Sequence, residues 1–83
     1  MLAKAPDLRV RIAGYTDNQG RASSNLALSR VRAQATRAYL AARGVAGARM
    51  TVAGYGAAHP VATNATAAGR AANRRIEFTV LGD

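Results

Sequence analysis

The feature that most constrains the fold is a long helix-like segment between two short strand-like runs. In residues 8–13, Leu8, Val10 and Ile12 occupy every second position, which is the period of a half-buried strand. The second run is 50–55, and the segment between them extends over about residues 23–43. A helix that returns the chain between two strands pairs them in parallel with a right-handed crossover. The sequence therefore predicts a βαβ unit.

The helix is expected to have Ser23 or Ser24 as its N-cap and to end before Gly44, at a left-handed C-cap. One arc of its wheel mixes apolar and polar side chains, and we expect this arc to face the core. Its members are Asn25, Leu28, Ser29, Arg32, Ala33, Thr36, Tyr39 and Leu40. The polar members gather near the N-terminal end, which predicts a site at the rim of the sheet. A solvated helix end explains the same residues equally well.

The rest of the chain predicts a loop over 56–62, a short helix or turn over 66–73 and a last strand over 74–81. In that strand Ile76, Phe78 and Val80 lie on one face. A last strand after a long connection is expected to be an antiparallel edge. The predicted fold class is α/β, an α+β sandwich with an open mixed sheet of about three strands and helices on one face.

Composition limits the classes of function. The 83 residues suffice for one domain, and twelve basic residues against four acidic ones give a net charge of +8. Such a charge favours polyanions such as nucleic acid, anionic lipid or an anionic glycan polymer, although a coding habit that prefers arginine explains it equally well. Cysteine is absent and His59 is the single histidine, so we expect neither a disulfide nor a multi-histidine metal site. No run approaches the roughly 18 apolar residues of a membrane span.

One acid and one base form the candidate centre. Asp17 lies in the turn-rich loop 14–20 that follows the first strand, and Arg32 lies on the arc that we expect to face the core. A buried unpaired charge is costly, so Arg32 needs a partner or a ligand. Asp17 is the expected partner, and a zwitterionic ligand could be held by both residues.

The sequence shows no arrangement typical of an enzyme. Asp17 and Glu77 are too distant in the predicted topology to act as a carboxylate pair, and the glycines form no phosphate-binding loop. No catalytic residue, cofactor or metal is therefore expected. Residues 64–75 supply a second group of hydrogen-bond donors, in which we expect Arg74 to face the Asp17 loop and Arg75 to face solvent.

Several motifs occur in an order and spacing that resemble one known family. They are Gly14-Tyr15-Thr16-Asp17-Asn18-Gln19-Gly20, Asn25-x-x-Leu28-Ser29-x-x-Arg32-Ala33, Tyr39-Leu40, Gly54-Tyr55-Gly56, Pro60-Val61-Ala62-x-Asn64-x-Thr66 and Gly69-Arg70-x-x-Asn73-Arg74-Arg75-Ile76-Glu77. Together they resemble the OmpA-like peptidoglycan-binding domain over about residues 10–80. This family includes C-terminal domains of porin-like outer-membrane proteins, peptidoglycan-associated lipoproteins and flagellar motor stator proteins.

The resemblance implies a non-catalytic domain that binds the diaminopimelate of the peptidoglycan stem peptide. Asp17 would bind the ammonium group of the ligand and Arg32 its carboxylate, while Asn25 and Arg74 match positions that add hydrogen bonds around the same pocket. Further candidates from these loops are Thr16, Arg70 and Asn73. The implied partner is peptidoglycan and the implied location is the periplasm, at the outer membrane of a Gram-negative-type envelope. The parent protein would carry the membrane anchor, with no membrane contact by this segment.

The alternative is a small basic domain that binds nucleic acid, which the charge alone motivates. Few aromatic residues and scattered basic residues count against this hypothesis, so no nucleic acid is expected as a partner. Tight binding of DNA or RNA that weakens steeply with salt, without binding to cell-wall material, would favour it.

The family's domains begin with another strand and helix ahead of the segment that starts at Leu8, and commonly have histidine where Tyr15 stands. We therefore expect residues 1–83 to be one OmpA-like domain that lacks its first strand and helix. Such a domain would leave a sheet edge unprotected and an apolar face uncovered.

We predict that the 83-residue chain is marginally stable, because a thin alanine-rich core offsets poorly the ordering cost of roughly 1–2 kcal/mol per residue. Adding the N-terminal strand and helix should raise the free energy of unfolding, measured by urea titration of both chains. Identical cooperative transitions would contradict this prediction.

Overall fold

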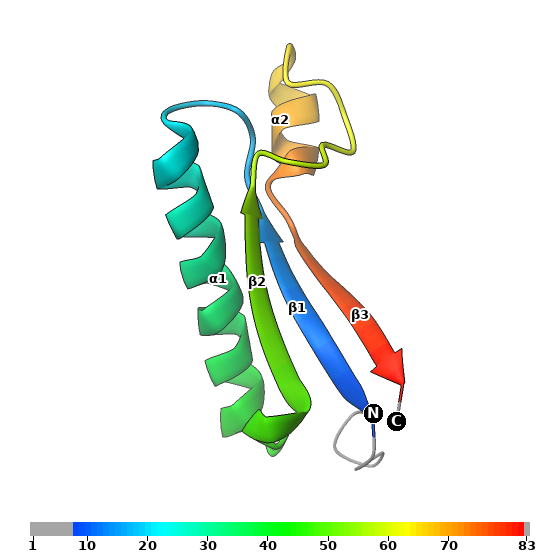
Figure 1. Cartoon of the computed structure of the whole chain (residues 1–83). Coiled ribbons are helices and arrows are strands. Elements are labelled where there is room, and N and C mark those ends of the chain that lie inside the picture. Colours follow the sequence, from blue (N-terminus) through cyan, green and yellow to red (C-terminus); the bar gives the residue numbers. More distant parts are fainter. Residues whose placement is uncertain (1–7, 83) are drawn as a thin grey trace.

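The structure is a computed structural model, and it describes residues 8–82 (Figure 1). Within this range the elements are β1 (Arg9–Tyr15), α1 (Ala22–Ala42), the short 3-10 helix η2 (Gly47–Arg49), β2 (Met50–Gly56), α2 (Ala67–Asn73) and β3 (Ile76–Gly82). The predicted order of strands and helices is confirmed. No helix of the described residues is both long enough and apolar enough to cross a membrane.

The three strands of the described chain form one mixed sheet in the order β2-β1-β3. β1 is parallel to β2 and antiparallel to β3, so that Ile12 lies between Val52 and Phe78. Both predicted pairings are confirmed. Because β1 and β2 are parallel, their carboxyl ends meet at one edge of the sheet, and the loops that follow them start side by side.

Glycines allow α1 to lie unusually close to the sheet. A Cβ on Gly14 of β1 would come 2.1 Å from the carbonyl oxygen of Ser29, and one on Gly54 of β2 would come 2.5 Å from the backbone nitrogen of Arg30. Below the glycines, Val10, Ile12, Ala33, Val45 and Met50 form the buried apolar core. Small residues on both surfaces therefore set the distance between helix and sheet.

The buried face of α1 is narrower than the predicted arc. Only Asn25, Ser29 and Ala33 of this helix are buried, while Leu28 and Tyr39 are exposed. The prediction was wrong for these two because α1 lies along β2 and β1 and not over β3 (Figure 1). The flank of the helix that faces β3 therefore meets little within residues 8–82.

The predicted N-cap is also wrong. Arg21 occupies the N-cap position of α1 without a side-chain hydrogen bond to the helix, and the helix starts at Ala22. Ser23 and Ser24 thus lie inside the first turn. At the other end, Gly44 has a φ of 98°, which confirms the expected left-handed residue after the helix.

β3 presents apolar side chains beside α1. Phe78 pairs with Ile12 and Val80 with Val10, so these two side chains share the face of the sheet that carries the helix. They are 55% and 59% exposed, whereas Ile76 packs against the core. The apolar face expected on the last strand is thus present, and nothing in the described part of the chain covers it.

We predict that Gly14→Ala destabilises the protein by about 1–3 kcal/mol, because the added methyl group overlaps helix backbone that cannot move alone. Gly47→Ala is the matched control, since its new Cβ would meet only the end of the Arg37 side chain at 3.0 Å. Urea unfolding of both variants measures the difference. Equal losses of stability would show that the close approach of α1 is not limiting.

Candidate functional site

Asp17 lies just beyond β1, at the edge where the two parallel strands end. The chain is fixed there by a 2.8 Å hydrogen bond from the backbone N–H of Thr16 to the carbonyl of Gly56, the last residue of β2. Asp17 is 8% exposed. Ligand sites of α/β sheets often lie outside the carboxyl ends of parallel strands, so the acid occupies a favourable position for binding.

The carboxylate of Asp17 is held by two donors. Arg74 donates from Nη1 to Oδ2 at 2.7 Å, and the backbone N–H of Gln19 donates to Oδ1 at 2.9 Å. The hydrogen bond from Gln19 and then the one from Arg74 lower the pKa of Asp17, and the charge of Arg70 lowers it further. Asp17 is therefore a carboxylate at neutral pH, with positive groups on one side.

The partner of Asp17 is not the one expected. The structure pairs Asp17 with Arg74, on the segment between α2 and β3. Arg32 is exposed on α1, and its side chain makes no ion pair or hydrogen bond within residues 8–82. The expectation of a core-facing Arg32 paired with Asp17 was wrong because the buried stripe of α1 is too narrow to include this position.

Arg32 nevertheless lies on the side of α1 that continues toward the Asp17 loop. Leu26 and Arg30 pack their backbone against β2, and at about 100° per residue Arg32 falls on the opposite flank. It follows Asn25 by two helical turns, about 10 Å along the axis. Helical side chains lean toward the N-terminus, which directs this arginine toward the loop.

Asn25 and Thr16 hold the Asp17 loop in place. The buried amide of Asn25 donates from Nδ2 to the carbonyls of Gln19 at 2.8 Å and of Asp17 at 3.4 Å. Thr16 Oγ1 donates to the same Asp17 carbonyl at 2.7 Å. Both side chains therefore fix the backbone from which the carboxylate extends.

Asn73 organises the loop that leads into α2. Its side chain is fully buried, and its Oδ1 accepts hydrogen bonds from the backbone N–H groups of Val61 and Ala62. Its Nδ2 donates to the Ala62 carbonyl and to Asn64 Oδ1. Arg70 adds a 2.9 Å bond from Nη1 to the Asn64 carbonyl, so that this loop is fastened to the helix that leads to Arg74.

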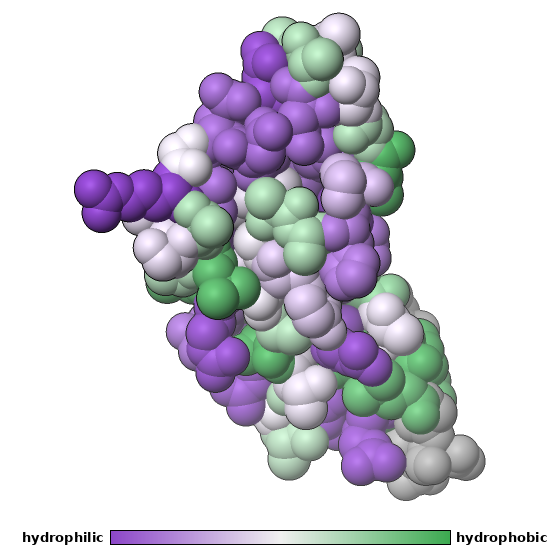
Figure 2. All heavy atoms as spheres, turned by 45° about the horizontal axis from the view of Figure 1, so that its top comes forward, coloured by the Kyte–Doolittle hydropathy of each residue, from purple (hydrophilic) through white to green (hydrophobic). Residues whose placement is uncertain are grey.

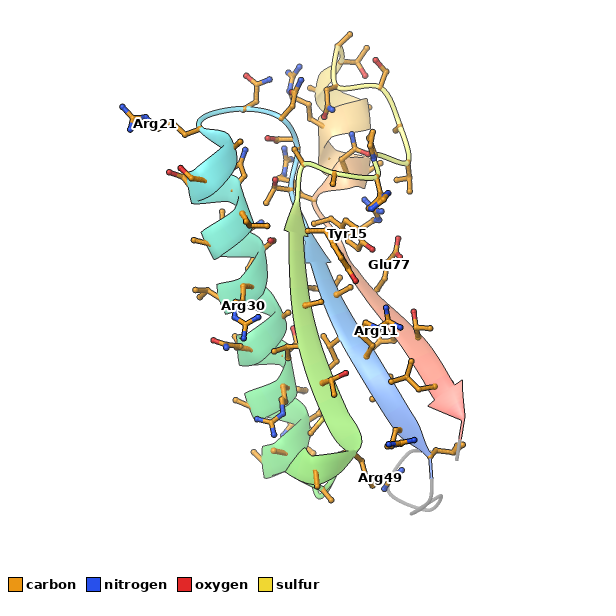
Figure 3. The ribbon with its side chains drawn as sticks, in the orientation of Figure 1. Arg11, Tyr15, Arg21, Arg30, Arg49 and Glu77 are labelled. Carbon is orange, nitrogen blue, oxygen red and sulfur yellow. The ribbon has the colours of Figure 1, made fainter. Side chains whose placement is uncertain are left out.

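The two adjacent arginines have different surroundings. Arg74 faces the Asp17 loop, as predicted. Arg75 was expected in solvent, but its side chain is 17% exposed and pairs with Glu77 at 2.6 Å. It lies 3.8 Å above the centre of the Tyr15 ring. The prediction was wrong because it took no account of the aromatic ring on the face of the sheet opposite α1, where Figure 3 shows Tyr15 and Glu77.

The end of the molecule that carries α2 and the loops is mostly hydrophilic (Figure 2). It brings together one carboxylate and the arginines 70 and 74, with Arg32 on the neighbouring helix. Such a set suits a ligand with both an ammonium and a carboxylate group. The described residues contain no cluster of three or more histidine, cysteine or acidic side chains that could hold a metal.

The structure is thus a small α/β domain with a buried carboxylate at the end of two parallel strands and arginines around it. A family model described as the OmpA family matches residues 1–74. The chain therefore belongs to the OmpA family.

Known proteins agree with this assignment. The chain is 51% identical over 79 residues to the peptidoglycan-binding protein ArfA of Mycobacterium tuberculosis. This alignment covers 95% of this chain and 24% of the relative. It is 47% identical to outer membrane porin F of Pseudomonas fluorescens, with the same coverage. The crystal structure of the peptidoglycan-associated lipoprotein from Burkholderia pseudomallei superposes with a TM-score of 0.92 at 37% identity, over 95% of this chain and 67% of that one. The chain thus spans about a quarter of these two curated relatives.

The lowered pKa of Asp17 predicts a specific dependence of stability on pH. Because the folded-state pKa lies below the ordinary value of 3.8, the carboxylate stabilises the fold above that value and loses this effect as the pH falls through the folded-state pKa. Asp17→Asn removes the titration. We expect the urea midpoint of the unmodified protein to fall more steeply than that of the variant between about pH 5 and pH 3. Parallel curves would contradict the prediction, since every other acid is common to both proteins.

Proposed function

We propose that this chain is a non-catalytic domain that binds peptidoglycan and thereby anchors its parent protein to the cell wall. The observation that carries the proposal is the Asp17 carboxylate, held at the sheet edge beside Arg74 and Arg70. Family membership supports it, because relatives include proteins named as peptidoglycan-binding or peptidoglycan-associated. These names describe binding proteins, which agrees with the absence of an enzyme-like arrangement in the sequence.

The ligand that we propose is the diaminopimelate of the stem peptide. The free end of this amino acid carries an ammonium and a carboxylate on one carbon. An acidic and a basic side chain at a fixed distance can therefore bind both charged groups at once. Asp17 would accept hydrogen bonds from the ammonium, and Arg32 would donate to the carboxylate from its exposed position on α1. Charge-assisted hydrogen bonds of this kind are shorter and stronger than neutral ones.

Arg74 has to share Asp17 with the ligand. Its side chain is 46% exposed, whereas that of Asp17 is 12% exposed. The arginine is thus the partner that is free to turn, and a small rotation would let it donate to the ligand as well. Thr16 and Asn25 would keep the loop in shape during this exchange, while Asn73 and Arg70 keep α2 in place.

We place the domain in the periplasm, on a parent protein that is attached to the outer membrane by another segment. The names of relatives support a location in the cell envelope, since they include an outer membrane porin and a lipoprotein. The surplus positive charge of +8 would favour retention near an anionic polymer without selecting a particular group on it.

The test is co-sedimentation with insoluble sacculi of the diaminopimelate type. We expect Asp17→Ala and Arg32→Ala each to reduce binding about tenfold or more, because each removes a charge-assisted contact. Arg30→Ala is the matched control: it removes the same charge from an exposed position on the opposite flank of α1, and it should bind like the unmodified protein.

A second set of sacculi tests the choice of ligand. Lysine-type stem peptides keep the terminal ammonium group but lack the second carboxylate, so binding should weaken on them and the effect of Arg32→Ala should disappear. Equal binding of Asp17→Ala, Arg32→Ala and Arg30→Ala to diaminopimelate-type sacculi would refute the proposed site.

A further inference from the structure

We infer that Arg75 is a positioning residue that holds Asp17 and Arg74 in register across the binding site. The geometry around Arg75 carries this inference by itself. The part of it that concerns ligand affinity rests on the proposed function.

Arg75 joins three separate segments of the chain. Its backbone exchanges two hydrogen bonds with Tyr15 at the end of β1, at 2.9 and 3.3 Å. Its guanidinium donates from Nε to Glu77 on β3 at 2.6 Å and from Nη2 to the carbonyl of His59, in the loop after β2, at 2.9 Å. The backbone and side chain of Arg75 together thus connect β3 to the end of β1 and to the loop after β2.

These contacts lie next to the site in the sequence. Tyr15 precedes Asp17 by two residues, and Arg75 directly follows Arg74. The backbone pair between Tyr15 and Arg75 therefore fixes the two points from which the Asp17 and Arg74 side chains extend. The 2.7 Å ion pair of Asp17 and Arg74 forms on one side of the Tyr15–Arg75 backbone pair. The Arg75 guanidinium makes its contacts on the other side of it.

The guanidinium is suited to this task in a way that lysine is not. Its Cζ lies 3.8 Å from the centre of the Tyr15 ring, and that ring also stacks with the ring of Tyr55 at 5.4 Å between centroids. Burial, and then the nearby Glu77 carboxylate, raise the pKa of Tyr15, so that the ring stays neutral. A planar fork can stack on a ring and donate in several fixed directions at once, whereas an ammonium group acts as a point charge.

The pKa of Asp17 reports its placement without any ligand. We propose to follow the Asp17 carboxyl by NMR in the full chain and in Arg75→Gln and Arg75→Lys. Loss of the fork should loosen the contacts from Gln19 and Arg74, so the Asp17 pKa should rise toward its ordinary value in both variants. Arg75→Lys separates position from charge, since it keeps the charge and loses the planar fork.

The control is Arg37→Gln. Arg37 also spans segments, donating to the carbonyls of Met50 and Gly47, but it does so at the other end of α1. This variant should lower stability and leave the Asp17 pKa unchanged. An unchanged Asp17 pKa in folded Arg75→Lys would overturn the inference. If Arg75→Gln does not fold, Glu77→Ala gives the same readout, because it removes the acceptor of the Nε hydrogen bond.

Ligand affinity gives the second readout, with free diaminopimelic acid as the probe. Arg75→Lys should weaken binding about tenfold, as is common for residues that support a binding group. The same substitution in an Asp17→Ala background should have no further effect. An equal loss in both backgrounds would show that Arg75 does not act through Asp17. If the unmodified protein does not bind the probe, the proposed ligand fails while the pKa measurement still decides the role of Arg75.

Discussion

The close contact between α1 and the two parallel strands is the constraint on which the rest of the structure depends. Ser29 sits at its centre, fully buried, with its hydroxyl accepting from the Gly56 N–H at 2.9 Å and donating to the Leu26 carbonyl at 2.7 Å. Only glycine at positions 14 and 54 leaves room for the helix backbone. Because the helix is fixed at this depth, its first turns bring Asn25 to the Asp17 loop, and the site is a consequence of that packing.

The site is built from segments that are distant in the sequence but fixed at one edge. Asp17 follows β1, and Arg74 stands 57 residues later, before β3. Two buried amides complete the arrangement: Asn25 holds the loop after β1, and Asn73 holds the loop before α2. Buried polar groups that are fully hydrogen-bonded fix a single backbone geometry, so the charged side chains start from well-defined positions.

The features that could be predicted from the sequence are those that depend on hydrophobic periodicity and on residues that end helices and strands. Alternation in β1, the long helix and the glycine at its end were enough to predict the order of elements along the chain and the parallel and antiparallel pairings. It did not predict which arginine meets Asp17, because that depends on the width of the contact between α1 and the sheet. A helical wheel treats Arg32 and Ser29 as neighbours on one arc, whereas only Ser29 is buried. The prediction that Arg75 faces solvent was wrong for a similar reason, since the groups that its side chain contacts, the Tyr15 ring and the His59 carbonyl, belong to other segments.

In each of the two ion pairs of the described chain, one of two adjacent arginines binds a different carboxylate. Arg74 and Arg75 engage the two carboxylates within residues 8–82, Asp17 and Glu77, on different sides of the same backbone. Each of these two acids is thus paired locally, and the other basic residues, Arg70 near Asp17 among them, account for the excess positive charge. A diffuse charge of this kind attracts any polyanion and is weakened by salt. On the proposed function, selectivity would come from the Asp17 region, where a carboxylate fixed among arginines suits a group that carries both charges.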